Sequence, residues 1–205
     1  MRFGLLFATA LAALTIFSQN AQAATHIYLL KGLANVFSTG LDTLSDELAK
    51  RGYRSEVHNH IEYEELADKA AKLQKADKGA IIIIGHSLGA DAAVSMAELL
   101  KTKGAKVALL VTFGPDDARV APTNVAHILN FNFGEHNITK GPGFRGTIKN
   151  VNLIGHEGIN HFNVEKIERL HATVIAEIQK VSRAPRPMPA QRPMPPHQSS
   201  ASNAK

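Results

Sequence analysis

One stretch decides the fold: Ala80-Ile81-Ile82-Ile83-Ile84-Gly85-His86-Ser87-Leu88-Gly89-Ala90-Asp91-Ala92-Ala93. Its four consecutive isoleucines predict a strand that is buried on both faces, as in a parallel sheet. The small residues at its end predict a helix, and the glycines between predict a tight turn. A strand, a turn and a helix in this order strain the residue at the tip and expose its side chain. Ser87 is therefore predicted to present its hydroxyl above a helix N-terminus, which favours negative charge.

The chain divides into three parts around this stretch. Residues 1–23 combine a basic start at Arg2, an apolar run and an Ala-Gln-Ala end. This pattern predicts a secretory signal peptide that is cleaved after Ala23, with an apolar run too short for a membrane span. Residues 24–182 form the predicted globular domain, and the Pro- and Arg-rich residues 183–205 predict a disordered tail. We therefore expect an exported protein, periplasmic or secreted, with no stable membrane span after cleavage.

Charge and cysteine content restrict the function classes. The net charge is +5, but one of the 23 basic residues lies in residues 1–23 and four lie in residues 183–205. The predicted domain keeps 18 basic residues against 18 acidic ones and is neutral, so it is not expected to bind nucleic acid. The chain has no cysteine, which excludes a disulfide framework, a thiol nucleophile and cysteine-based metal sites.

Strands and helices alternate along the predicted domain. The predicted strands cover residues 25–30, 53–57, 81–84, 107–113, 125–133 and 147–154. Helices are predicted near residues 39–51, 61–76, 87–103 and 162–181, the first of them capped by Thr39 with Asp42. Alternation of this kind predicts an α/β fold, a three-layer doubly wound and mainly parallel sheet of about six strands. The isoleucine strand is expected near its centre.

Residues 25–181 resemble the α/β-hydrolase family. The resemblance rests on Gly85-His86-Ser87-Leu88-Gly89, on the order of the strands, and on Ile159-Asn160-His161-Phe162 near the end. The size is similar to that of minimal lipases and esterases, and parts of the chain resemble the thioesterase branch. The resemblance implies the α/β-hydrolase fold and a catalytic triad that follows in the order serine, acid, histidine. Ser87 is the implied nucleophile.

The serine hydroxyl needs a base to take its proton and an acid to hold that base. Among the ten histidines, His161 follows the last predicted strand and precedes the last helix. Such a loop lies at the carboxyl edge of a doubly wound sheet, beside the turn that carries Ser87. His161 is the predicted base, because Ile159-Asn160-His161 resembles the last motif of the family. His156, in the same loop, is the alternative.

Three carboxylates compete for the place of the acid. Asp116 and Asp117 follow the strand at 107–113, and Glu135 follows the strand at 125–133. Most α/β-hydrolases place the acid in the second loop, whereas the thioesterase branch commonly has an aspartate at the end of the first strand. Gly114 occupies that strand end here, two residues before Asp116. Asp116 is the predicted acid, with Glu135 and Asp117 as alternatives.

The resemblance also implies an oxyanion hole made by two backbone N–H groups, those of Leu33 and Leu88. These features predict a serine hydrolase that cleaves a carboxylic ester or thioester through an acyl-enzyme, with a small-molecule or lipid ester as its partner. A non-catalytic binding module on this scaffold and an acyltransferase with the same triad are the alternatives. No metal is expected, because His58 and His60 have no third ligand within sequence reach. No cofactor is expected either, because the sequence has no dinucleotide-binding fingerprint.

Overall fold

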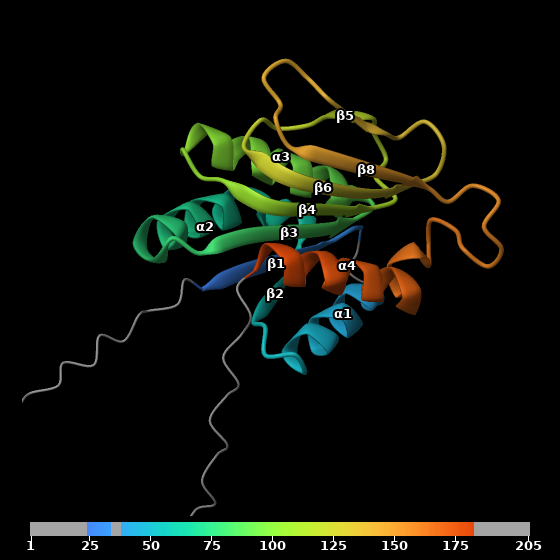
Figure 1. The fold of residues 1–205 in the computed structure, drawn as a ribbon. Coiled ribbons are helices and arrows are strands. Elements are labelled where there is room, and N and C mark those ends of the chain that lie inside the picture. The colour runs from blue at the N-terminus through green and yellow to red at the C-terminus, as the bar shows by residue number, and fades with distance from the viewer. Residues whose placement is uncertain (1–23, 34–37, 183–205) are drawn as a thin grey trace, which may run out of the picture.

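The computed structural model describes residues 24–33 and 38–182 (Figure 1). The predicted signal peptide and the predicted tail lie outside the described residues. The helices are α1 (Thr39–Ala49), α2 (Tyr63–Asp77), α3 (Leu88–Thr102) and α4 (Glu168–Val181). The strands of the main sheet are β1 (Thr25–Lys31), β2 (Ser55–Asn59), β3 (Ala80–His86), β4 (Val107–Phe113), β6 (Val125–Asn132) and β8 (Thr147–Asn152).

The six strands form one sheet in the order β2-β1-β3-β4-β6-β8. Every neighbouring pair in it is parallel. Helices α1 and α4 cover one face and helices α2 and α3 cover the other (Figure 1). The predicted three-layer, doubly wound parallel sheet of about six strands is confirmed, and the isoleucine strand is β3, in the interior of the sheet.

The four isoleucines of β3 explain why the sheet has two cores. Ile81 and Ile83 pack into the cluster that includes α2 and α3, whereas Ile82 and Ile84 pack into the cluster that includes α1 and α4. All four side chains are fully buried. Burial of one such side chain stabilises the fold by about 1.5–3 kcal/mol, so this strand anchors both layers and fixes the start of the turn that follows it.

The structure differs from the sequence prediction at several element ends. The N-cap of α1 is Ser38 rather than Thr39, and its side chain makes no capping hydrogen bond, because it is engaged with Gly32 and His86 instead. Helix α2 begins two residues later than predicted, after a 3₁₀ turn at His60–Glu62. A similar turn at Val164–Lys166 delays α4.

A second, two-stranded sheet was not predicted. It pairs β5 (Arg119–Val120) with β7 (Ile138–Thr139) in parallel. Two residues are too few to show a periodic pattern, so the pairing depends on how the loops after β4 and β6 meet in space. In the described part of the chain, no helix has both the length and the apolarity that a membrane span requires.

Candidate active site

Ser87 lies between β3 and α3 with a strained backbone. Its φ of 56° and ψ of −128° are rare for a residue other than glycine. The Ser87 N–H donates a hydrogen bond of 2.9 Å to the carbonyl oxygen of Phe113, at the end of β4. A Cβ atom on Gly85 would overlap the Gly89 carbonyl, and one on Gly89 would overlap the Leu30 carbonyl. Only glycine fits at either position, and the turn therefore has the form of a nucleophile elbow.

His161 lies in the loop between β8 and α4 and reaches this turn. Its Nε2 atom is 3.0 Å from the Oγ atom of Ser87. Aromatic rings surround the imidazole: the edge of Phe162 at a centroid distance of 5.5 Å, the ring of His86 at 5.5 Å and that of Phe133 at 6.5 Å. In the tautomer with hydrogen on Nδ1, Nε2 accepts the Ser87 hydroxyl proton.

The carboxylate of Asp116 lies beside the same two atoms. Its Oδ2 is 3.5 Å from the Ser87 Oγ, and its Oδ1 is 3.9 Å from the Nε2 atom of His161. The Asp116 N–H donates to the Oδ2 of Asp91 over 2.9 Å, which ties the loop to α3. The structure thus brings Asp116 to Ser87 and His161. Its charge, however, lies near Nε2, whereas the acid of a serine-protease triad bonds to Nδ1.

Gly114 occupies the space beside the Nδ1 atom of His161. A Cβ atom built on Gly114 would lie 3.0 Å from that nitrogen. Gly114 has a φ of +54°, and its N–H donates to the carbonyl of Phe131 over 2.7 Å. No side chain among the described residues forms a hydrogen bond with Nδ1. The strand end at which the thioesterase branch commonly has an aspartate is therefore glycine here, and it lies against the imidazole.

The two residues predicted for the oxyanion hole flank the elbow. Leu88 is the first residue of α3, where a backbone N–H has no acceptor within the helix. Leu33 follows Gly32, and a Cβ atom on Gly32 would lie 3.1 Å from the Cβ of Ser87. The loop after β1 therefore runs alongside Ser87. Lys31, just before Gly32, forms an ion pair of 2.6 Å with Asp42.

The nucleophile elbow, the all-parallel doubly wound sheet and the histidine after the last strand belong together in one architecture. The chain has the α/β-hydrolase fold. No protein-family model and no curated protein sequence matches it.

Two solved structures match most of this α/β-hydrolase domain. The type II thioesterase BorB from the borrelidin biosynthetic cluster is 10% identical, with a TM-score of 0.44, and the match covers 78% of this chain and 96% of that chain. A variant of YbtT, the type II thioesterase from the yersiniabactin NRPS/PKS biosynthetic pathway, is 10% identical, with a TM-score of 0.41. That match covers 80% of this chain and 96% of that chain. These likenesses concern the fold alone, and nothing about a substrate follows from them.

The alternative candidates lie apart from the pair formed by Ser87 and His161. Asp117, Glu135 and His156 are all exposed. In residues 24–33 and 38–182, no hydrogen bond or ion pair joins any of these three side chains to Ser87 or to His161.

Two residues near the elbow were missed by the sequence analysis. Asp91 is four residues after Ser87 on α3, so helical spacing places it on the same face, beneath the Asp116 loop. Burial raises the pKa of the Asp91 carboxyl, and Arg119 lies 3.9 Å from it. His86 is buried behind the elbow, where burial lowers the pKa of its imidazole. The spacing could have shown Asp91, but no sequence pattern indicates what His86 contacts.

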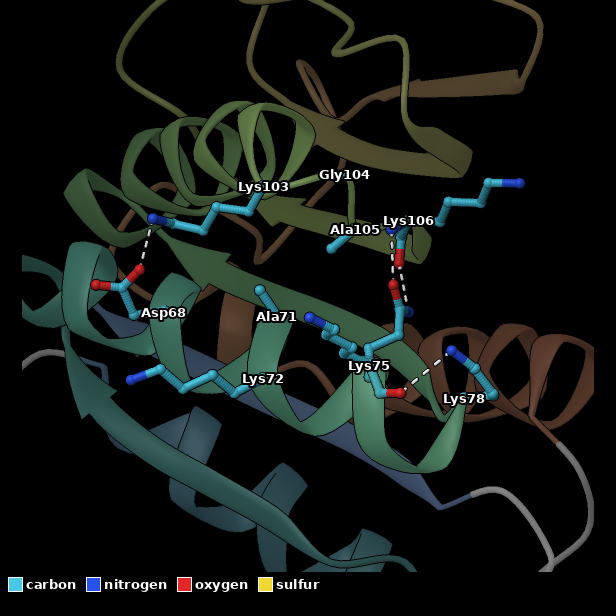
Figure 2. Close-up of a pocket in the computed structure, with 10 residues that line it drawn as sticks. Asp68, Ala71, Lys72, Lys75, Lys78, Lys103, Gly104, Ala105 and Lys106 are labelled. Atoms are coloured by element: carbon cyan, nitrogen blue, oxygen red, sulfur yellow. Dashed lines mark hydrogen bonds and ion pairs between the residues drawn. The ribbon is translucent and has the colours of Figure 1, made fainter.

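A cleft of about 700 Å³ lies far from Ser87, at the end of the sheet where the strands begin. It lies between the C-terminal ends of α2 and α3 (Figure 2). Five lysines line it, but Lys103 is paired with Asp68, and Lys78 donates to the carbonyl of Lys75. Figure 2 shows Lys72 and Lys106 extending in opposite directions. Lysines near helix C-termini are favoured by the helix dipole, so the cleft needs no ligand to explain it. Within the described ranges, no three His, Asp or Glu side chains are grouped as a metal site requires.

Proposed function

We propose that this protein is an exported serine hydrolase that cleaves a carboxylic ester or a thioester through an acyl-enzyme intermediate. The observation that carries the proposal is the distance of 3.0 Å between the Oγ atom of Ser87, at a strained elbow, and the Nε2 atom of His161. A hydroxyl in this position can pass its proton to the imidazole as it attacks, which is how serine becomes nucleophilic at neutral pH.

The proposed reaction has two halves. The Oγ atom of Ser87 bonds to the acyl carbon while its proton moves to Nε2 of His161, and the carbonyl electrons move to the oxygen. The N–H groups of Leu33 and Leu88 hold that oxyanion. The carbonyl re-forms, the bond to the leaving alkoxide or thiolate breaks, and His161 returns the proton to the leaving group. Water then repeats the sequence on the acyl-enzyme, which releases the acid and free Ser87.

In the proposed reaction, the carboxylate of Asp116 stabilises the positive charge that forms on His161. His161 becomes cationic when it takes the serine proton, and a carboxylate oxygen 3.9 Å from Nε2 stabilises that cation. The Asp116 carboxylate is 44% exposed, so water screens part of the attraction. We therefore assign to Asp116 the stabilisation of this charge and not the orientation of the imidazole.

Apolar side chains around the nucleophile favour a substrate with an apolar acyl group. Among the described residues, six large apolar side chains are exposed: Leu33, Ile61, Leu88, Val120, Ile154 and Phe162. Leu88 directly follows Ser87, and Leu33 directly follows Gly32, which lies against Ser87. The ring of Phe162 packs against that of His161. Exposed apolar surface that gathers at one site indicates a binding surface for apolar groups. An exported protein does not meet coenzyme A thioesters, which favours a carboxylic or lipid ester.

The proposal is tested by hydrolysis of nitrophenyl esters of increasing acyl length. Turnover is expected in the unaltered protein, with kcat/KM rising as the acyl chain lengthens. Ser87→Ala should abolish ester hydrolysis. Ser45→Ala should not, because the hydroxyl of Ser45, on α1, forms a hydrogen bond with that of Ser55, on β2, away from the site. Transfer of the acyl group to an added alcohol in preference to water would favour an acyltransferase. Equal residual rates for both variants would contradict the proposal.

A further inference from the structure

His86, the residue before the nucleophile, joins three segments of the site through one buried imidazole. Its side chain is only 2% exposed. Its Nδ1 atom is 2.8 Å from the hydroxyl of Ser38, at the start of α1, and its Nε2 atom is 2.9 Å from the backbone carbonyl oxygen of His161. The Ser38 hydroxyl also accepts a hydrogen bond of 3.0 Å from the N–H of Gly32, directly before Leu33.

These contacts fix the tautomer of His86. A carbonyl oxygen can only accept, so the Nε2 atom carries the hydrogen and donates it to His161. The Nδ1 atom is then an acceptor, and it takes the hydroxyl proton of Ser38 while the Ser38 oxygen accepts from Gly32. In the protonated ring, Nδ1 would donate to the Ser38 oxygen, and the Ser38 hydroxyl hydrogen would have no acceptor among the described residues, so the neutral imidazole satisfies all of these groups. Burial lowers the pKa of His86 and so favours that form.

The charged groups around His86 agree with a neutral ring. The nearest is the carboxyl of Glu165, fully buried and 3.7 Å from the Nε2 atom. Burial raises the pKa of Glu165, which favours its neutral form as well. The hydrogen bond to the His161 carbonyl favours a positive charge on His86, whereas the charges of the His161 ring and of Lys166 disfavour it, and Asp116 has a weaker influence that favours it. Burial is the largest of these influences, and it lowers the pKa of His86.

We infer that His86 is a positioning residue that holds both the loop of the base and the loop of the oxyanion hole against the elbow. The inference rests on the proposed function, because it assigns the base to His161. In a triad an acid at Nδ1 would orient the imidazole, but Gly114 lies there. His86 instead fixes the backbone from which the His161 ring extends. A displacement of about 1 Å in such a site can reduce the rate about 100-fold.

Two amide substitutions separate the two contacts of the ring. In His86→Gln, the side-chain amide nitrogen reaches the place of Nε2 and can donate to the His161 carbonyl. In His86→Asn, the amide ends near the place of Nδ1 and can contact only Ser38. We expect the Asn variant to lose 10-fold to 100-fold in kcat with little change in KM, and the Gln variant to recover most of that loss. Both variants are compared at a pH and temperature at which circular dichroism shows them folded.

The rate of labelling by a fluorophosphonate gives a second readout that needs no substrate. It should fall in the Asn variant and recover in the Gln variant. His127→Asn serves as the control, since His127 is an exposed residue of β6 that contacts Thr147. Equal rates for His86→Asn and the unaltered protein would overturn the inference, as would equal losses in the Asn and Gln variants. If the unaltered protein is not labelled at all, it is the proposed function that fails.

Discussion

A Cβ atom built on Gly114 would lie 3.0 Å from the Nδ1 atom of His161, so the end of β4 meets the imidazole on the side away from Ser87. This contact distinguishes the site from a serine-protease triad, in which an acid bonds to Nδ1. The ring lies between a glycine at Nδ1 and a serine and a carboxylate at Nε2. Its orientation therefore depends on close contact with the surrounding backbone and rings.

Gly114→Ala should reduce both stability and turnover. The φ of +54° costs a non-glycine residue about 1–2 kcal/mol of stability, and the added methyl group would press on Nδ1. Gly104→Ala is a matched control, because Gly104 has a φ of +71° but no atom within 4 Å of the added methyl. Urea unfolding should show similar losses for both variants, while kcat should fall only for Gly114→Ala. A normal kcat in a folded Gly114→Ala variant would show that the contact is unimportant.

Asp116→Asn should lower kcat by about 10-fold to 100-fold. Loss of a triad acid at Nδ1 costs about 10⁴ in a serine protease, but Asp116 supplies charge near Nε2 from a partly exposed position. Asp117→Asn and Glu135→Gln should leave kcat unchanged, since neither side chain is joined to His161. Steady-state kinetics on one ester checks all three. A large loss of kcat in Glu135→Gln would instead indicate that the catalytic acid lies in the loop after β6.

The buried imidazole of His86 should make the free energy of unfolding depend on pH. Its folded pKa lies below the ordinary value of about 6.5, so the unfolded chain binds a proton that the folded chain does not. Its contribution to stability is present above pH 6.5 and is lost as the pH falls through the folded pKa. The free energy of unfolding should therefore decrease less between pH 7 and pH 5 in His86→Gln than in the unaltered protein. Parallel pH curves from urea unfolding would contradict this.

Export is predicted from the basic start, the apolar run and the Ala-Gln-Ala end of residues 1–23. N-terminal sequencing of the protein purified from its source should begin at Ala24. Recovery of the chain from the cytoplasm with Met1 in place would contradict the prediction.

The sequence predicts β3, the turn and α3 well because their signals are local. A run of isoleucines, two glycines that permit close packing, and a helix former after them all lie within one short stretch. His161 follows from the chain order of the fold, without any contact being known. The contacts of His86 carry no such signal, since its partners lie 48 and 75 positions away. Nor does sequence tell on which side of the imidazole Asp116 lies, because the path of its loop depends on Asp91 and on the pairing of β5 with β7.

If Ser87 is a nucleophile activated by His161, a reagent that bonds only to activated serines should modify it. The purified protein is treated with a fluorophosphonate, its intact mass is measured, and the modified residue is located by peptide mass spectrometry. We predict one adduct, on Ser87, at a rate that collapses in His161→Ala and is unchanged in His156→Ala. An unmodified Ser87 in folded protein, or a labelling rate that does not depend on His161, would contradict activation of Ser87 by His161.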